Sequence, residues 1–303
     1  MLTHDDMLRL QAEEHGLIAP DGPRTLEEQC LHLIHLKAYE EAAGMPGQAV
    51  LDVGCNTGYG TRLLGRHRRE IVGVDVSAEA VRQARQLPGT RRVAFQVMDG
   101  KELPFADGRF DLVVSFQVIE HVVDHASYLS EIRRVLAPHG RAVFTTPNAV
   151  LRLLPGMKPW NPFHVREFGA LQLEQLLDPH FAGIEIRGLF GAEGIRSVEM
   201  KRLERLRTKA LRKENRARQG VRWLRERARK GLPRGWVLAA SGTFRWLKGR
   251  PLPAAPQGGR SACPFSTRDL FYATRNLDQA LDLMAVCDRG QVDDAEADRS
   301  SGG

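Results

Sequence analysis

Cysteine is scarce in this chain of 303 residues, and the four cysteines, Cys30, Cys55, Cys263 and Cys287, lie far apart. No C-x-x-C pair is present, which argues against a zinc site and a disulfide framework, and we expect no bound metal. Long apolar runs are also missing, since no stretch approaches the roughly 18 apolar residues that a membrane-spanning helix needs. The N-terminal residues lack the basic and apolar regions of a signal peptide, so we expect a cytoplasmic protein.

The composition is that of an ordinary globular protein, with 42% hydrophobic and 27% charged residues. The net charge of +7 is unevenly spread, because residues 201–234 contain 15 Lys or Arg and three acidic residues, a local net charge of +12, whereas the remainder carries −5. A pI near 9.5 would otherwise suggest a nucleic-acid-binding surface. Only the basic segment is therefore a candidate for contact with anionic partners.

Apolar runs alternate with helical patterns from residue 26 to residue 190. The predicted strands are 49–54, 71–76, 93–98, 110–116, 141–146 and 183–190. The predicted helices are 26–43, 59–68, 78–87, 125–136 and 167–177, and Ser77 is placed to cap the third of them. Continuous apolar strands between amphipathic helices indicate a parallel sheet that is covered on both faces.

The remainder of the chain changes character. From residue 196 the pattern is that of a basic helix, followed by an aromatic segment, Trp236–Trp246, and a Pro/Gly-rich linker. We then expect a last strand at 270–274 and a last helix at 277–287. The predicted domains are an N-terminal helical segment (1–45), a core (46–195), a basic helical insertion (196–262), the final strand and helix of the core (263–287) and a disordered polar tail (288–303).

The first predicted strand leads into a glycine-rich turn, Asp52-Val53-Gly54-Cys55-Asn56-Thr57-Gly58-Tyr59-Gly60. Glycine suits positions where the chain turns sharply or a ligand approaches the backbone, because a Cβ atom there would collide. The next helix presents N–H groups to such a ligand. Asp75 ends the second strand, where doubly wound folds bind a ribose, and Asp99 follows the third strand. Together these residues predict a nucleoside pocket.

These residues resemble the motifs of class I S-adenosylmethionine-dependent methyltransferases, over roughly residues 26–190 and again near Leu270. Segments 50–58, 72–75 and 98–100 resemble the first three motifs of the family. Segments 103–113, 116–122 and 136–141 resemble later motifs of its quinone and small-molecule methyltransferases. The resemblance implies S-adenosyl-L-methionine as the cofactor. It also implies a Rossmann-like doubly wound α/β sheet of seven strands, mostly parallel with an antiparallel last strand, plus a basic helical insertion.

The resemblance implies cofactor-binding roles for nine residues: Asp52, Gly54, Asn56, Gly58, Asp75, Val76, Asp99, Gly100 and Gln117. By that resemblance, Gly54 and Gly58 let the loop pass close to the methionine portion, and Asp75 holds both ribose hydroxyls. Asp99 is expected to bind the adenine amino group, and Gln117 to lie near the methionine chain. Asn56 replaces the middle glycine of the family's G-x-G-x-G, and Asn tolerates left-handed geometry better than other non-glycine residues.

A nicotinamide-dependent dehydrogenase is the alternative with the same architecture. Its dinucleotide fingerprint is G-x-G-x-x-G, whereas residues 54–60 read G-x-N-x-G-x-G. Asp52, directly before the turn, would also lie badly next to a pyrophosphate. The methyltransferase interpretation is therefore favoured.

In-line transfer of a sulfonium methyl group mainly requires an acceptor held close to the methyl carbon, with water excluded. A base helps with a hydroxyl acceptor, and His164 is our candidate because it follows the fifth predicted strand and its exit loop. Residues 164–168, His-Val-Arg-Glu-Phe, resemble a segment of bacterial methyltransferases linked to surface glycans and lipids. We expect methyl transfer, at oxygen, to a small-molecule, glycan or lipid-linked acceptor. A structural role for His164, in capping and packing the next helix, stays open.

The basic insertion determines which partners we expect. It could be a solvated arm that packs on the core or on a second copy of the chain in a homodimer. It could instead hold residues 201–246 on an anionic membrane, at its inner face, with Trp223, Trp236, Phe244 and Trp246 in the interface. Nucleic acid is a weaker candidate, because no recognisable RNA- or DNA-binding module is present. A non-catalytic or RNA-directed protein that binds through this arm is the alternative function.

Overall fold

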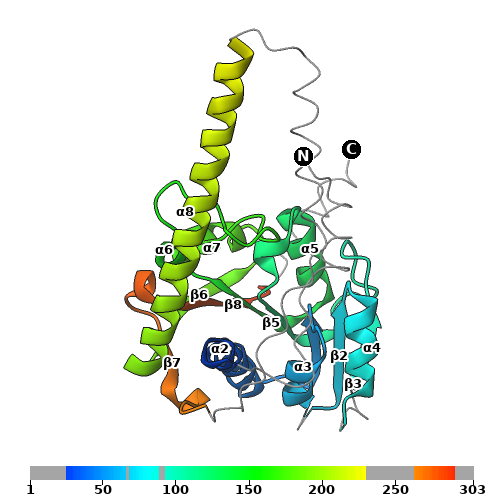
Figure 1. Ribbon diagram of the computed structural model, residues 1–303. Helices are drawn as coiled ribbons and strands as arrows, with labels where there is room; N and C mark the ends of the chain where they lie inside the picture. The colour runs from blue at the N-terminus through cyan, green and yellow to red at the C-terminus, as the bar shows by residue number, and fades with distance from the viewer. Residues whose placement is uncertain (1–24, 66–67, 89–92, 230–262, 291–303) are drawn as a thin grey trace, which may run out of the picture. The chain divides into compact units, whose positions relative to one another are not determined.

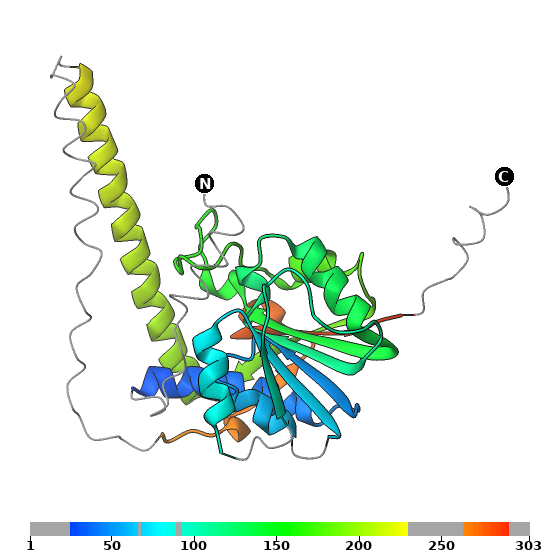
Figure 2. The same cartoon turned by 90° about the vertical axis from the view of Figure 1, so that its right-hand side faces the viewer.

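The core of the molecule is a mixed β-sheet with helices against its faces (Figures 1 and 2). The computed structural model describes residues 25–65, 68–88, 93–229 and 263–290. Residues 1–24 of the predicted N-terminal segment, the aromatic segment Trp236–Trp246, the linker and most of the predicted tail lie outside these ranges. Within them, the sheet has eight strands.

The strand order is that of a doubly wound sheet. The strands are β1 (Ala49–Val53), β2 (Glu70–Asp75), β3 (Val93–Val97), β4 (Phe110–Phe116), β5 (Leu136–Pro147), β6 (Ala182–Gly191), β7 (Leu270–Ala273) and β8 (Asp282–Asp288). Their order across the sheet is β3-β2-β1-β4-β5-β8-β6-β7. β1 to β5 are parallel, β8 is antiparallel to β5 and β6, and β7 is antiparallel to β6. The Rossmann-like class is confirmed. We predicted seven strands with one of them antiparallel, whereas the sheet of the described ranges has eight strands with two of them antiparallel.

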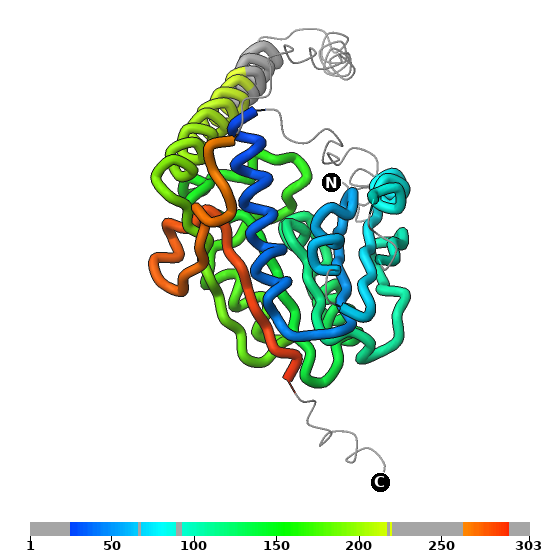
Figure 3. The backbone as a smooth tube through the Cα atoms, turned by 90° about the horizontal axis from the view of Figure 1, so that it is seen from below, coloured from blue at the N-terminus to red at the C-terminus, as the bar shows by residue number. Residues whose placement is uncertain are grey.

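Helices cover both faces of the sheet. They are α2 (Leu26–Ala43), α3 (Tyr59–Leu64), α4 (Ala78–Gln86), α5 (His125–Val135), α6 (Ala149–Arg152), α7 (Ala170–Leu177) and α8 (Glu193–Arg229), with 3₁₀ turns η2 (Ile119–His121), η3 (Thr267–Asp269) and η4 (Leu277–Gln279). Successive strand residues point to opposite faces. Val50 therefore packs in a core with α2 and α3, whereas Leu51 packs in a second core with α5 and α7. Figure 3 shows α2 in blue alongside β8 in red, with which it shares the first of these cores.

Polar caps fix where two of the helices begin. At the start of α2, Glu28 N donates to Thr25 Oγ1 and Thr25 N donates to Glu28 Oε2, which forms a capping box. Ser77 Oγ accepts the N–H of Ala80 at 3.3 Å, so the predicted cap of α4 is confirmed. The predicted strands and helices up to residue 191 are confirmed, but β5 begins at Leu136 and not at the predicted residue 141, and α3 ends at Leu64 and not at residue 68.

The last element of the core is a strand, and the helix predicted at 277–287 is wrong. Residues Leu277–Gln279 form a 3₁₀ turn, and Asp282–Asp288 form β8 between β5 and β6. Every residue of β8 except Asp288 is buried. A short apolar run that is buried on both faces lacks the alternation of a half-exposed strand, so its pattern does not separate a strand from a buried helix.

The chain divides into two compact units, Met1–Arg202 with Cys263–Gly303, and Leu203–Ala262. The described part of the second unit is the C-terminal portion of α8, which has 37 residues in total. The basic pattern is thus helical up to Arg229, and the predicted boundary at residue 196 lies inside α8. Among the helices of the described ranges, none has the length and apolar character that crossing a membrane demands.

Candidate active site

A cavity of about 320 Å³ opens where β1, β2, β4 and β5 end, and it lies in the first unit. Doubly wound sheets bind ligands at this edge, next to the point where the strand order reverses between β1 and β4. Seven of the ten predicted site residues line the cavity: Gly54, Asn56, Asp75, Val76, Gly100, Gln117 and His164. The fold therefore brings most of the predicted cofactor residues and the predicted catalytic residue to one place.

The turn after β1 brings its backbone to the cavity wall. Gly54 has a φ of 81°, and a Cβ atom added there would lie 2.4 Å from Cγ2 of Val118. Asn56 has a φ of 46°, which lies in the left-handed region that Asn tolerates better than other non-glycine residues. The N–H groups of Gly54 and Cys55 both donate to the carbonyl oxygen of Val74, which ties the turn to β2.

Asp75 anchors this side of the cavity. Its Oδ2 accepts the N–H of Asn56 at 2.8 Å, and its Oδ1 accepts the N–H of Ser77 at 2.9 Å. The residue is 9% exposed and lines the cavity. Each carboxylate oxygen has two lone pairs, so both oxygens can accept a further hydrogen bond from a vicinal diol such as a ribose.

Asp52 is not among the described residues that line the cavity. It is fully buried, and it accepts hydrogen bonds from Thr61 Oγ1 at 2.7 Å and from the Tyr39 hydroxyl at 3.3 Å. Burial raises the pKa of Asp52 to about 7, and these two hydrogen bonds oppose the rise. Tyr39 does line the cavity. Asp52 thus holds a wall residue, and its direct contact with a cofactor stays a prediction.

Gly58 and Asp99 also lie outside the cavity lining as far as the structure describes it. Gly58 precedes α3 with a φ of 77°, and a Cβ atom there would lie 2.6 Å from the Phe95 ring and 2.8 Å from Ala84 Cβ. Close packing therefore requires this glycine. Asp99 is exposed, and its Oδ1 accepts the N–H of Lys101 at 2.8 Å. A cofactor contact of either residue stays a prediction.

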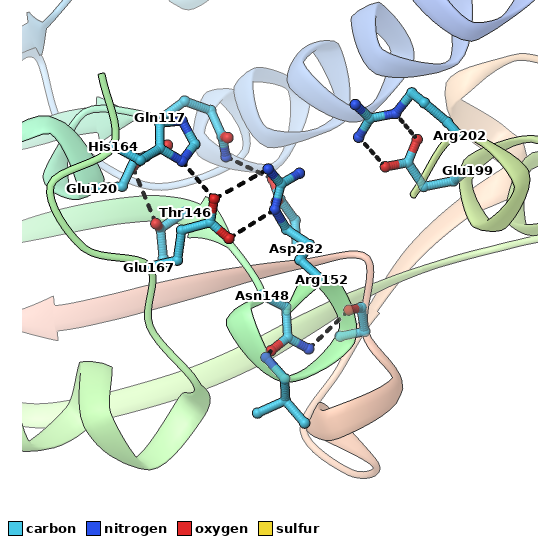
Figure 4. A network of polar contacts seen from close by, with 12 residues as sticks. Gln117, Glu120, Thr146, Asn148, Arg152, His164, Glu167, Glu199, Arg202 and Asp282 are labelled. Atoms are coloured by element: carbon cyan, nitrogen blue, oxygen red, sulfur yellow. Dashed lines mark hydrogen bonds and ion pairs between the residues drawn. The ribbon is translucent and has the colours of Figure 1, made fainter. Parts of the chain in front are cut away.

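The opposite side of the cavity is formed by η2 and by the loop before α7. Val165 N donates to the carbonyl oxygen of Glu120 at 2.8 Å, and Nδ1 of His121 lies 2.9 Å from the carbonyl oxygen of Phe163. These bonds hold the loop against η2 and bring His164 near Glu120 (Figure 4). The rings of His121 and His164 are 4.7 Å apart and nearly perpendicular.

A buried ion pair, Arg152 and Glu167, holds His164 in place through its Nδ1 atom (Figure 4). Nδ1 of His164 lies 2.7 Å from Glu167 Oε1, and Arg152 donates to both oxygens of Glu167 at 2.9 and 3.2 Å. Burial alone would raise the pKa of Glu167, but the hydrogen bond from His164 and the charge of Arg152 outweigh it and lower the pKa. An ionised carboxylate only accepts, so the hydrogen of the neutral ring is on Nδ1 and the lone pair is on Nε2. That nitrogen can accept a proton or bind a cation.

Two buried acids on this side were not among the predicted site residues. Glu120 accepts a hydrogen bond from Thr146 through Oε2 at 3.1 Å, and burial raises its pKa to about 7. Asp282 accepts a hydrogen bond from Gln117 Nε2 at 2.7 Å, and burial raises its pKa well above the ordinary range. Both line the cavity. Glu120 belongs to a motif that resembles the family but has no assigned role there, and Asp282 lies in the stretch predicted as a helix.

Known proteins match the part of the chain that builds this site. The family model described as "Methyltransferase domain" matches residues 51–144. A probable S-adenosylmethionine-dependent methyltransferase of Mycolicibacterium smegmatis is 37% identical over 188 residues, which cover 59% of this chain and 71% of the relative. The chain belongs to the S-adenosylmethionine-dependent methyltransferases.

This methyltransferase is also similar to two further proteins, one over less than half of the chain and one in fold at low sequence identity. The chloroplastic tocopherol O-methyltransferase of Arabidopsis thaliana is 32% identical over 147 residues, which cover 44% of this chain and 42% of the relative. The solved structure of the [4+2]-cyclase SpnF has a TM-score of 0.51 and 20% identity, over 96% of this chain and 97% of that chain. The structural likeness shows the fold alone, since one fold carries many reactions.

The cofactor of this methyltransferase is S-adenosylmethionine, and the dehydrogenase alternative is set aside. The residues present fit this cofactor. Asp75 offers two fixed acceptor oxygens for a ribose, and at Gly54 a side chain would collide with the opposite wall. A positively charged sulfonium in this cavity would favour the ionised forms of the buried acids Glu120 and Asp282, which line it.

Proposed function

We propose that this methyltransferase transfers a methyl group from S-adenosylmethionine to a hydroxyl oxygen of a small-molecule, glycan or lipid-linked acceptor. The observation that supports this most is that one cavity joins the Asp75 side to the buried polar groups Glu120 and His164. Partial similarity to a tocopherol O-methyltransferase also favours oxygen as the acceptor atom.

The proposed reaction is an in-line displacement. The bound cofactor supplies an electrophilic methyl group. The acceptor oxygen, held against Glu120 and His164, forms the new O–C bond as the S–C bond breaks, and the electron pair of that bond stays on sulfur. The hydroxyl proton would pass to the lone pair on Nε2 of His164, whose Nδ1 is bonded to Glu167. Proximity and the exclusion of water would provide most of the rate enhancement.

On the cofactor side, Asp75 would accept hydrogen bonds from the ribose hydroxyls, and Gly54 would allow the methionine portion to approach the backbone. Val76 and Gly100, which also line the cavity, would contact the nucleoside. Gln117 has a φ of 58°, and its side chain donates to Asp282, so it would lie at the methionine end, between the two sides.

Calorimetric titration with S-adenosylhomocysteine tests the cofactor part of the proposal. Asp75→Ala should weaken binding about 10- to 150-fold, because a hydrogen bond to a charged group contributes about 1.5–3 kcal/mol. Asp107→Ala is the matched control, since it removes a carboxylate that is 77% exposed and does not line the cavity as described. Equal affinity of Asp75→Ala and the parent would contradict the assignment.

Methyl-labelled S-adenosylmethionine tests the acceptor part. Each trial acceptor, a quinol, a glycan or a glycolipid, is paired with an analogue in which an amine replaces the hydroxyl. Label should reach the hydroxyl compound of at least one pair, and His164→Gln should reduce that turnover by about 100-fold or more without changing S-adenosylhomocysteine affinity. Label found only on amines would contradict oxygen transfer, and unchanged turnover would remove His164 from the reaction.

A further inference from the structure

Glu120, His121 and His164 lie close together in the cavity, although accepting a proton would require only one of them. Each residue offers one ligand atom, and the three atoms lie within 4.8 Å of one another. All three residues line the cavity. A carboxylate with two imidazoles is a donor set that proteins use for divalent transition-metal ions.

Both imidazoles are oriented as metal ligands usually are. Nδ1 of His121 bonds to the carbonyl oxygen of Phe163 at 2.9 Å, and Nδ1 of His164 bonds to Glu167 Oε1 at 2.7 Å. These oxygens only accept, so in the neutral rings each Nδ1 carries the hydrogen and each Nε2 carries the lone pair. Metal-binding histidines almost always donate their other ring N–H to a carbonyl or carboxylate of this kind.

Glu120 supplies the third ligand and an independent indication. Glu120 is only 1% exposed, and its Oε2 accepts a hydrogen bond from the hydroxyl group of Thr146. Oε1 has no hydrogen-bond partner among the described residues. Because a buried carboxylate oxygen without a partner is costly, such an atom points to a group that completes the site. A cation between Glu120 and the two imidazoles would be that group.

We propose that Glu120, His121 and His164 bind a divalent transition-metal ion such as Zn²⁺, Mn²⁺, Fe²⁺ or Co²⁺. Two imidazole ligands disfavour Mg²⁺ and Ca²⁺, which prefer oxygen ligands. Three protein ligands leave positions open for another molecule, as in catalytic metal sites. Our expectation of no metal came from cysteine spacing, which carries no information about His and Glu ligands from separate segments.

The use of this ion rests on the proposed function. The acceptor hydroxyl would occupy an open position, and the ion would lower the pKa of that hydroxyl, as bound metals do for water. Its proton would pass to solvent, the oxygen would form the O–C bond, and the S–C electron pair would stay on sulfur. His164 would then act as a ligand instead of receiving the proton, and Glu167 would be a positioning residue.

Titration of the full chain with Co²⁺ tests the site, because the visible absorption of Co²⁺ reports its ligands. After removal of metals with a chelator and dialysis, the parent should bind one Co²⁺ per chain. Glu120→Gln and His164→Gln should each weaken Co²⁺ binding at least about tenfold, and Glu167→Gln, which leaves the ligands in place, about 10- to 100-fold. His180→Gln removes a histidine that does not line the cavity as described, so its Co²⁺ affinity should equal that of the parent.

Three results would overturn the metal site: no Co²⁺ complex with the parent, unchanged affinity in both ligand variants, or a thiolate-to-cobalt absorption band, which would place the ion on cysteine. S-adenosylhomocysteine affinity, measured for each variant, shows whether the fold is intact. Full methyl transfer by the enzyme after removal of metals would show that the ion takes no part in the reaction, and the proposed function would be unaffected. Conversely, Co²⁺ binding by a parent that fails to bind S-adenosylhomocysteine would reject the proposed function and retain the metal site.

Discussion

The two sides of the cavity are built in opposite ways. The Asp75 side comes mainly from residues 54–76, a continuous turn, helix and strand, whereas the Glu120 side gathers residues from η2, the loop before α7 and β8. Asp75 is held by backbone N–H groups, while His164 is held by Glu167, which is itself held by Arg152. The Asp75 side, which we call the cofactor side, is therefore mainly a local structure. The Glu120 side, which we call the acceptor side after the proposed function, depends on tertiary packing.

Charge is also stabilised differently on the two sides. Both oxygens of Asp75 accept backbone N–H groups, which no single side-chain substitution removes. Glu167, by contrast, depends on two other side chains in a buried environment. Loss of one partner leaves a buried charge uncompensated there, so substitutions should be more damaging on the acceptor side.

The largest effect is expected from Arg152→Met, which leaves Glu167 charged and buried without its guanidinium. Breaking a buried pair in this way typically lowers the unfolding free energy by about 3–5 kcal/mol. Arg141→Met is the matched control, because the Arg141 and Asp288 side chains are 45% and 51% exposed and such a pair contributes less than about 1 kcal/mol. Urea titration measures both variants. Equal losses would show that buried charge does not distinguish the acceptor side.

A smaller loss is expected from Gly58→Ala, on the cofactor side. The new Cβ atom would combine left-handed strain with collisions against Phe95 and Ala84, for a loss of about 3 kcal/mol. Gly156→Ala isolates the strain, because Gly156 has a φ of 75° and no atom within 4 Å of the new Cβ, so about 1 kcal/mol is expected. Thermal unfolding of the two variants gives the difference. If the two losses were the same, packing would not be the reason for glycine at position 58.

Asp99→Ala should affect S-adenosylhomocysteine affinity less than Asp75→Ala does. Asp99 is exposed and already accepts the N–H of Lys101, so the one hydrogen bond that it would accept from the adenine amino group should contribute about 1.5 kcal/mol, the lower limit for a bond to a charged group. Calorimetry should therefore show a decrease of about tenfold. A larger decrease than that caused by Asp75→Ala would contradict the proposed placement of the ribose at Asp75 and the adenine at Asp99.

The smallest effects are expected from single residues of basic α8, which we propose binds an anionic membrane surface. Each Lys or Arg near such a surface contributes about 1 kcal/mol, so Arg212→Gln should weaken binding to phosphatidylserine vesicles about fivefold, and salt should weaken it further. Arg82→Gln is the control, because it removes an exposed arginine of α4. Co-sedimentation measures both. Tighter binding to RNA than to vesicles at the same salt concentration would instead favour nucleic acid.

The sequence predicted the parallel part of the sheet and the turn after β1 because both are local. Apolar strands and Ser77 as a cap are properties of a few neighbouring residues, and the structure confirms both. The prediction failed at β8, where burial on both faces removes the alternation that identifies a strand. That failure also concealed Asp282, which β8 brings into the cavity.

Sequence alone determined that this chain folds as a doubly wound sheet with a glycine-rich turn after its first strand, because hydrophobic periodicity and glycine placement act over a few residues. Only the tertiary structure decided which acids and imidazoles line the cavity opposite Asp75. Phe163 and His121 are 42 residues apart, and the hydrogen bond that joins them becomes visible only once the loop has packed against η2. The side that contains Glu120 and His164 is therefore a product of packing, whereas most of the Asp75 side is encoded in residues 54–76.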